Sequence, residues 1–236
     1  MTGQAIKNNY QLHNSGLDTI MVSWPGQNVA PRLLAHVAAH LQASLSWIID
    51  LTVSQEAIQC RYNILERLYH DAKNDIKQAL QSFEGEQTVV SNIKKVRIPV
   101  CYHPSLAPDL ERVLQQCALS EDAFKQLHSR TEYSVAMIGF APGFGYLQGL
   151  PEELQLPRLK SPRVSVPRGS IAIADQYSAV YPQTSPGGWS LVGKTPISLF
   201  NPAIVPPCLL SVGATVKFDV IELDEYKAME QELSAS

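Results

Sequence analysis

Proline and glycine punctuate the segment from Ile138 to Pro196 every few residues, and this pattern limits the possible fold more than any other feature. Proline removes a backbone hydrogen-bond donor and glycine costs backbone entropy, so long helices are excluded here. The segment is also too rich in aromatic side chains for a solvated linker. These aromatic residues include Phe140, Phe144, Tyr146, Tyr181 and Trp189. We therefore predict short strands and tight turns that present aromatic and basic side chains, as in a binding site built on β-structure.

The composition argues against several classes of protein. The 236 residues have a net charge of −3 and no basic stripe, so we expect no nucleic-acid partner. No apolar run approaches the roughly 20 residues that span a bilayer, and the polar N-terminus lacks the apolar core of a signal peptide. The four cysteines are widely spaced without a CxxC pair, which indicates reduced thiols rather than disulfides or a zinc site. We therefore expect a cytoplasmic protein with no membrane association and no metal site.

The pattern of residues 1–92 predicts a small α/β domain. Apolar residues at helical spacing follow Pro31, with Asn28 as a candidate N-cap, and a second helical pattern runs from Leu65 to Leu80. The predicted strands are residues 19–24, 47–53 and 57–62. The resulting order, β-α-β-β-α, is close to the split βαβ pattern of ferredoxin-like domains. We therefore predict a ferredoxin-like N-terminal domain.

Residues 93–236 have a different pattern and predict an all-β core with two short helices. The helices are expected over residues 108–117 and after Ser120, which is a candidate N-cap. The predicted strands are residues 95–102, 135–140, 164–166, 171–174, 179–181, 190–192, 197–200 and 215–220. Many short strands separated by Gly/Pro turns favour a barrel or a sandwich. The charged tail after Glu222 is expected to fray.

One motif in this part is misleading. Residues Gly188 to Thr195 match the phosphate-loop pattern GxxxxGK[ST] letter for letter. Such a loop needs a buried strand before it and a helix after it, so that the helix N-terminus faces the phosphates. Here Pro186 precedes the glycines and Pro196 follows the threonine, so we predict no phosphate loop.

Basic residues near the prolines are candidates for binding an anion. Arg158, Arg163 and Arg168 lie within eleven positions, each beside a proline. They form either an ordinary solvated surface or an anion site, because guanidinium groups match carboxylate and phosphate. His128, near the end of a predicted helix, is either a packing residue or a proton-transfer group. The pattern alone does not decide between these alternatives.

Several motifs in the second part resemble one protein family. These are PGFGYL from Pro142, PRLKSPRVSVPRGS from Pro157 and SPGGW from Ser185, in this order. The combination is similar to allophanate hydrolase subunit 1, the carboxyltransferase subdomain C and D family, which includes the B-type subunit of 5-oxoprolinase and KipI-type kinase inhibitors. The resemblance is strong from about residue 96 to residue 202 and weaker, though collinear, before that.

The resemblance implies a fold, a reaction and partners. The expected fold class is α+β: the small N-terminal domain is followed by a cyclophilin-like β-barrel. The expected function is that of one component of an ATP-dependent amide or lactam hydrolase, in the first place a 5-oxoprolinase that converts 5-oxoproline to glutamate. Its partners would be a homologous second protein, of the type of allophanate hydrolase subunit 2 or the C-type subunit of 5-oxoprolinase, and a third protein. ATP with Mg²⁺ would act in the complex, with no cofactor bound by the isolated chain.

The resemblance also implies a site. His128 or Glu132 would handle a proton, Arg158 and Arg163 would hold a carboxylate or phosphoryl group, and glycine amides would stabilise negative charge. The substrate-binding residues would be Phe140, Pro142, Gly143, Phe144, Tyr146, Arg158, Arg163, Ser170, Gln176, Tyr181, Pro186, Gly187, Gly188 and Trp189.

The chain departs from the family pattern at one turn. Residues 174–178, ADQYS, stand where the family has a glycine-rich turn, and their side chains are expected to narrow the site because they resist positive φ. This departure keeps an alternative open, in which the chain inhibits a histidine kinase by binding without catalysis. A third alternative, a prolyl isomerase, would depend on fold alone.

Overall fold

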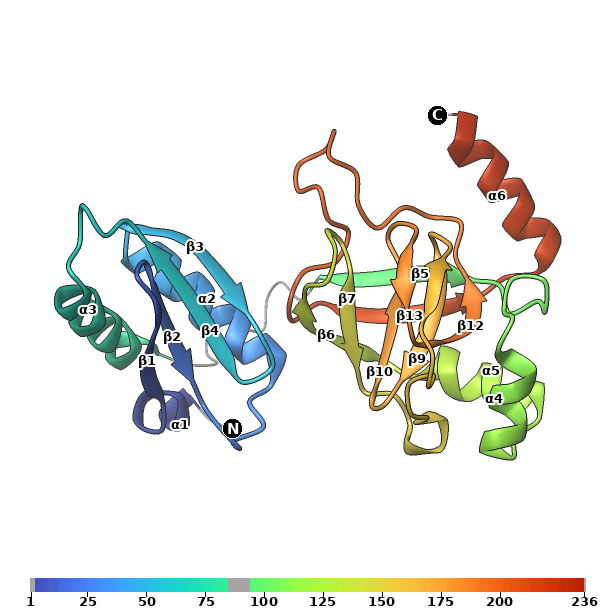
Figure 1. The fold of residues 1–236 in the computed structure, drawn as a ribbon, viewed down its shortest axis with the longest axis horizontal. Helices are drawn as coiled ribbons and strands as arrows, with labels where there is room; N and C mark the ends of the chain where they lie inside the picture. Colours follow the sequence, from blue (N-terminus) through green and yellow to red (C-terminus); the bar gives the residue numbers. More distant parts are fainter. Residues whose placement is uncertain (1–2, 85–93, 236) are drawn as a thin grey trace. The chain divides into compact units, whose positions relative to one another are not determined.

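The computed structural model describes residues 3–84 and 94–235. The chain divides into two compact units, Met1–Ile93 and Lys94–Ser236, and each is described by itself (Figure 1). The predicted domain boundary, between residues 92 and 93, lies outside the described residues.

The first unit is one antiparallel sheet with helices packed against it. Its elements are α1 (Gly3–Asn8), β1 (Gln11–Gly16), β2 (Thr19–Ser23), α2 (Pro31–Ser44), β3 (Ile48–Val53), β4 (Ala57–Tyr62) and α3 (Tyr69–Ser82). The strand order is β1-β2-β4-β3. Buried apolar residues of α2, α3 and the sheet share one core, which includes Leu34, Ile58 and Ile76.

The ferredoxin-like prediction for this unit is not confirmed. Strands β2 and β3 both pair antiparallel with β4 and therefore run parallel to each other, as a split βαβ unit requires. However, the sheet position beside β2 is filled by β1, which precedes the unit instead of following its second helix. The N-cap prediction was also wrong: Ala30 occupies the cap of α2, and Asn28 has a φ of 43°. Leu65 and Leu68 precede α3 and are exposed.

The second unit contains a seven-stranded sheet that nearly closes into a barrel. Its strands are β5 (Lys95–Val100), β6 (Tyr133–Ile138), β7 (Gly145–Gln148), β9 (Ser170–Ala174), β10 (Tyr177–Val180), β12 (Ser190–Lys194) and β13 (Thr215–Val220). The order is β12-β9-β10-β7-β6-β13-β5, and only β13 and β5 pair in parallel. The two edges meet where Cys101, just after β5, bridges Lys194 at the end of β12. The predicted mixed α and β content and the barrel are thus confirmed.

Helices and a small ribbon complete this unit. They are α4 (Leu110–Cys117), α5 (Glu121–Arg130), the 3₁₀ turn η2 (Glu152–Leu154), α6 (Leu223–Ala235), and β8 (Arg163–Val166) paired with β11 (Ser185–Gly187). Ser120 caps α5 as predicted, because its Oγ accepts a hydrogen bond from the Ala123 amide. The expected fraying tail is instead helix α6, which is anchored by the buried Tyr226.

Two further predictions are settled by the local backbone. Residues 197–200 do not form a strand: only Phe200 bridges, to Cys208. Residues 195–214 contain no helix, and Lys194 ends strand β12. The rejection of the phosphate loop is therefore confirmed.

Candidate functional site

The outer face of strand β9 carries small side chains, and this leaves room for a layer of aromatic residues. Side chains alternate between the two faces of a strand. On β9, Ile171 and Ile173 point into the barrel core, whereas Ala172 and Ala174 belong to a second apolar cluster on the other face. That cluster also contains the aromatic residues Phe144, Tyr177, Tyr181 and Trp189. Alternation in the sheet thus separates the barrel core from a second, largely aromatic cluster on the outer face.

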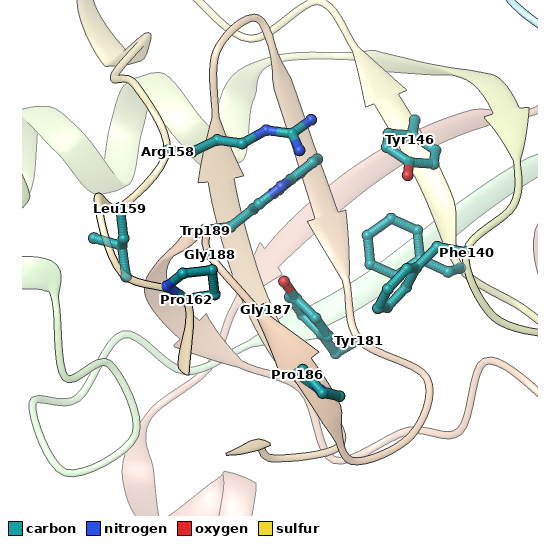
Figure 2. Close-up of a pocket in the computed structure, with 11 residues that line it drawn as sticks. Phe140, Tyr146, Arg158, Leu159, Pro162, Tyr181, Pro186, Gly187, Gly188 and Trp189 are labelled. Atoms are coloured by element: carbon teal, nitrogen blue, oxygen red, sulfur yellow. The ribbon is translucent and has the colours of Figure 1, made fainter. Parts of the chain in front are cut away.

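A pocket of about 180 Å³ lies in this aromatic layer. Its lining residues are Phe140, Phe144, Tyr146, Arg158, Leu159, Pro162, Tyr181, Pro186, Gly187, Gly188 and Trp189 (Figure 2). The volume is below the range of about 300–1,000 Å³ that is typical of drug-sized ligands. The pocket therefore fits a ligand about the size of one amino acid.

Aromatic rings in edge-to-face contact form the wall of the pocket. The ring centroid of Phe144 lies 5.3 Å from that of Tyr181 and 5.9 Å from that of Trp189. Tyr146 makes a similar contact with Trp189, at 5.8 Å. These separations are within the favourable range for aromatic pairs. The rings therefore hold one another in place, and ligand binding needs little further ordering of these side chains.

Phe140 combines an unusual backbone conformation with exposure. Its φ is 72°, and the residue is 61% exposed although its ring contacts Phe144 and Tyr181. Bulky residues rarely adopt positive φ, and such strain is concentrated at functional sites. Phe140 therefore stands at the mouth of the pocket as a ring that a ligand or a partner could cover.

Arg158 supplies the one positive charge of the pocket lining. Its guanidinium lies 5.8 Å from the ring centroid of Trp189, and its Nε is 3.3 Å from the Asp175 carboxylate. Asp175 adopts a φ of 50°, so the non-glycine turn keeps a left-handed residue. The turn that was predicted to narrow the site brings a carboxylate to Arg158. A ligand carboxylate could replace that partner.

The pocket offers hydrogen-bond donors but no acid or base. Burial raises the pKa of the Tyr181 hydroxyl, with a smaller contribution from Tyr146, so Tyr181 stays protonated at neutral pH and can donate. Figure 2 shows this hydroxyl pointing into the space between the labelled residues. None of the lining residues is a carboxylate or an imidazole. The pocket is therefore equipped to bind and orient a ligand, and it lacks its own group for proton transfer.

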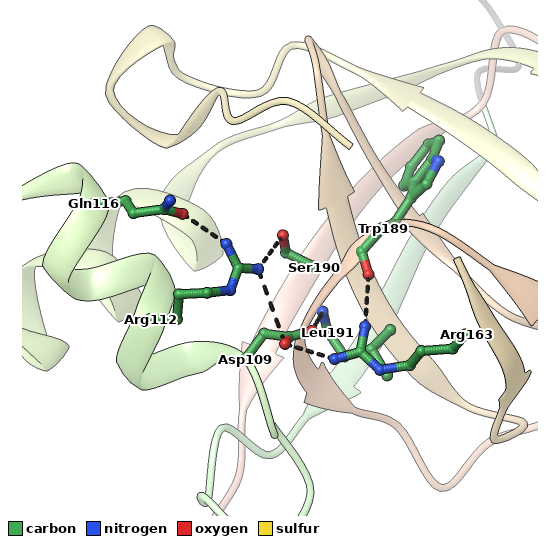
Figure 3. Close-up of polar contacts among 7 residues, drawn as sticks. All are labelled: Asp109, Arg112, Gln116, Arg163, Trp189, Ser190 and Leu191. Atoms are coloured by element: carbon green, nitrogen blue, oxygen red, sulfur yellow. Dashed lines mark hydrogen bonds and ion pairs between the residues drawn. The ribbon is translucent and has the colours of Figure 1, made fainter. Parts of the chain in front are cut away.

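Arg163, predicted to bind the substrate, is part of a structural cluster behind the pocket. Its Nη2 donates to Asp109 Oδ1 at 2.6 Å, and its Nη1 donates to the Trp189 carbonyl at 3.4 Å (Figure 3). Asp109 Oδ2 accepts the Leu191 amide at 2.7 Å, and Arg112 lies 3.8 Å from Oδ1. The cluster ties the start of α4 to strands β8 and β12. Arg163 therefore positions the backbone of Trp189 and does not line the pocket.

The fourteen predicted substrate-binding residues divide into two groups. Nine of the fourteen line the pocket: Phe140, Phe144, Tyr146, Arg158, Tyr181, Pro186, Gly187, Gly188 and Trp189. The rest do not: Pro142, Gly143, Arg163, Ser170 and Gln176. Gly143 has a φ of 82° and packs against Leu199 and Phe200, which explains the glycine by backbone geometry. Leu159 and Pro162 also line the pocket and were not predicted, although they lie inside the matching proline-arginine motif.

The two candidates for proton transfer lie outside the pocket. Glu132 is exposed between α5 and β6. His128 is completely buried, stacked on Phe218 with a centroid separation of 4.7 Å. Tyr102 is hydrogen-bonded to its Nδ1 at 2.7 Å and Ser178 to its Nε2 at 3.2 Å. This placement supports the packing interpretation of His128.

We expect His128 to make stability dependent on pH. Burial lowers its pKa from 6.5 to about 3, so the unfolded chain binds a proton between these values that the folded chain does not bind. Stability should therefore fall as pH falls through 6.5, by about 2 kcal/mol between pH 7 and pH 5. Urea unfolding at pH 7, 6 and 5 measures this, and His128→Gln should flatten the slope. His70→Gln, at an exposed position on α3, is the control; equal slopes for wild type and His128→Gln would contradict the prediction.

Two kinds of feature are absent from residues 3–84 and 94–235. No group of three or more His, Cys, Asp or Glu side chains is placed to hold a metal ion. No helix in these ranges is long and apolar enough to cross a membrane.

Comparisons with known proteins agree with the resemblance seen in the motifs. A family model for the carboxyltransferase domain, subdomain C and D, matches residues 10–210. The B-type subunit of 5-oxoprolinase from Bacillus subtilis is 42% identical over 164 residues, which cover 70% of this chain and 68% of that protein. The protein of the same name from Escherichia coli O157:H7 is 40% identical over 174 residues, covering 72% of this chain and 80% of that protein.

A solved structure supports the fold. The crystal structure of TTHA0988 aligns with a TM-score of 0.75 and 28% identity, over 86% of this chain. The chain covers 40% of the length of TTHA0988, so it corresponds to a part of that protein. The matches in sequence and in structure lead to one conclusion. The chain belongs to the carboxyltransferase domain family, subdomain C and D.

Proposed function

We propose that this chain is one component of a 5-oxoprolinase complex, which opens the lactam ring of 5-oxoproline to give glutamate at the expense of ATP. The similarity to two proteins named as B-type subunits of 5-oxoprolinase supports the reaction. The observation that carries the proposal is the pocket itself, which combines aromatic walls, one guanidinium (Arg158) and two phenols (Tyr146 and Tyr181) in about 180 Å³.

The chemistry of the pocket matches that of the substrate. 5-Oxoproline is a small five-membered lactam with one carboxylate. In our proposal the carboxylate takes the place of Asp175 on Arg158, because guanidinium pairs well with carboxylate. The ring lies against Phe144 and Trp189, and the Tyr181 hydroxyl donates to the lactam oxygen.

The absence of an acid and a base from the pocket lining suggests which catalytic groups come from the other subunits. Since the pocket lining has no carboxylate or imidazole, we assign the proton-transfer groups and the contacts to ATP and Mg²⁺ to other subunits. The partners we propose are a homologous second subunit and a third protein. The isolated chain should then bind substrate with little turnover. We place the complex in the cytoplasm, where ATP is available.

The test is ATP hydrolysis by the chain co-purified with its companion subunits, with and without 5-oxoproline. We expect turnover that needs the substrate and vanishes when this chain is omitted. Arg158→Ala should lower kcat/KM for 5-oxoproline about tenfold, which is the effect of losing one charge-assisted contact. Arg130→Ala, which removes an exposed arginine outside the pocket, is the matched control. An Arg158→Ala complex within twofold of wild type would refute the assignment of this pocket.

The kinase-inhibitor hypothesis stays open as a prediction from the sequence. Suppose the companion subunits form a stable complex with this chain, but 5-oxoproline does not stimulate ATP hydrolysis. That result would favour either kinase inhibition or a hydrolase that acts on a different amide.

A further inference from the structure

A second pocket lies between helix α6 and the end of strand β12. It has a volume of about 360 Å³ and shares no lining residue with the aromatic pocket. Its polar lining comes from three places: Arg168 and Thr184 in turns, Lys194 and Thr195 at the end of β12, and Tyr226 and Glu230 on α6. Lys194 and Thr195 are the last residues of the rejected phosphate-loop motif, and Arg168 is the third arginine of the proline-rich segment.

The donors in this pocket are suited to an anion. Among the described residues, the Arg168 guanidinium has no hydrogen bond or ion pair, since only its backbone amide is bonded, to Thr184 Oγ1 at 3.4 Å. Thr195 Oγ1 accepts from the Ile197 amide at 3.5 Å. Each hydroxyl oxygen thus accepts a bond from the chain and keeps its own hydrogen for another acceptor. Two cations and two hydroxyls are the groups that bind phosphate.

The backbone holds these donors in fixed positions. Gly169 has a φ of 80°, and a Cβ there would overlap the Thr195 carbonyl oxygen. The Thr195 amide donates to the Gly169 carbonyl at 2.9 Å, and the Gly169 amide donates to the Tyr181 carbonyl at 2.8 Å. The turn that carries Arg168 is therefore tied directly to the end of β12. A site supported in this way is already formed before a ligand arrives.

An anion of the chain already lies against this site. The Tyr226 hydroxyl donates to Glu230 Oε1 at 2.6 Å, and Lys194 Nζ lies 3.8 Å from the same oxygen. The Lys194 ammonium also lies 5.7 Å from the Tyr226 ring centroid. The Glu230 side chain is about half exposed, and a half-exposed ion pair contributes little to stability. An incoming anion would thus replace Glu230 in a weak ion pair with Lys194 and as the acceptor of the Tyr226 hydroxyl.

We propose that this pocket binds a small organic phosphate, with Glu230 on α6 as a competing internal anion. The charge supports phosphate, because a phosphate monoester carries about −1.5 to −2 at neutral pH and meets two cations here. The volume supports an organic ester, since about 360 Å³ lies within the range for organic ligands. The proposal does not depend on the proposed function, because it needs neither 5-oxoproline nor a partner subunit.

Calorimetric titration of the 236-residue chain with glycerol 3-phosphate tests the proposal. Glycerol at matched ionic strength is the neutral control ligand. Glu230→Gln removes the competing charge and keeps an acceptor for Tyr226, so it should bind the phosphate about tenfold more tightly than wild type. Glu225→Gln, an exposed change on the same helix outside the pocket, should bind like wild type.

The cations are tested in the tighter-binding background. Adding Arg168→Ala or Lys194→Ala to Glu230→Gln should weaken binding about tenfold, whereas adding Lys217→Ala, on β13 outside the pocket, should leave it unchanged. Inorganic phosphate that binds as well as the ester would overturn the organic class. Equal binding of glycerol, no binding to Glu230→Gln, or binding that survives both cation changes would overturn the site. Melting temperatures of all variants confirm that each is folded.

Discussion

Replacing Gly187 by alanine should close the aromatic pocket and lower kcat/KM for 5-oxoproline in the proposed complex about a hundredfold. A Cβ at this position would overlap the Tyr181 hydroxyl and lie 2.8 Å from Tyr181 Cζ. Tyr181 is 2% exposed and packs against Phe144, so it cannot turn away without disturbing the wall. Overpacking of this kind typically costs about 1–3 kcal/mol and displaces neighbouring side chains.

The neighbouring glycine provides a matched control. A Cβ at Gly188, which also lines the pocket, would meet Pro162 at 3.7 Å, an ordinary contact. Gly188→Ala should therefore leave the melting temperature close to wild type, whereas Gly187→Ala should lower it. Adding Tyr181→Phe to Gly187→Ala removes the overlapping oxygen and should restore part of the stability. If Gly187→Ala and Gly188→Ala behave alike, Tyr181 does not form this wall.

The aromatic pocket could be predicted from the sequence because its residues are close together in the chain. Phe140, Phe144, Tyr146 and the Gly187–Trp189 turn lie in one proline- and glycine-rich segment, and the short strands between them force the turns into proximity. Local turn chemistry thus determines much of this site. The place of Arg163 behind the pocket could not be predicted for the converse reason, since its partner Asp109 lies 54 residues earlier.

Other predictions failed where tertiary contacts override a local pattern. Strand β1, QLHNSG, has no apolar alternation, because its side chains are mostly exposed and it is held by pairing with β2. Without that strand, the first sheet resembled a ferredoxin-like order. Helix α6 looked like a charged tail because its anchor in the core is chiefly Tyr226. His128 could not be interpreted from the sequence, since its hydrogen-bond partner Ser178 and the stacked Phe218 are distant in the chain.

Asp109→Asn should lower the free energy of unfolding of the barrel by about 3 kcal/mol. The Asp109 side chain is 9% exposed and its two oxygens serve Arg163 and the Leu191 amide. Asparagine keeps one acceptor, so one of these donors loses its partner, and the Arg163 charge is left uncompensated in a site where it is 30% exposed. Removing one partner of a fully buried ion pair costs about 3–5 kcal/mol. We expect a value at the low end because Arg163 is partly exposed.

The same substitution in a surface pair provides the control. Asp219→Asn, which removes the partner of the exposed Arg97, should cost much less, because solvent screens an exposed ion pair. Hydrogen exchange of peptides from β9 and β12 measures the stability of the barrel by itself. The measurement contradicts the prediction if both variants lose the same amount.

A double-mutant cycle separates a positioning role of Arg163 from a direct one. If Arg163 acts through Asp109 and the Trp189 carbonyl, Arg163→Met should reduce stability, and the Asp109→Asn, Arg163→Met pair should lose clearly less than the sum. Because Arg163 does not line the pocket, the fall in kcat/KM should then follow the fall in stability. If Arg163 instead contacts the substrate, Arg163→Met should lower kcat/KM without a matching loss of stability. The two substitutions should then have additive effects on the free energy of unfolding. That result would support the substrate-binding role that the sequence predicts for Arg163. It would also mean that the pocket changes shape in the complex so that Arg163 reaches the substrate.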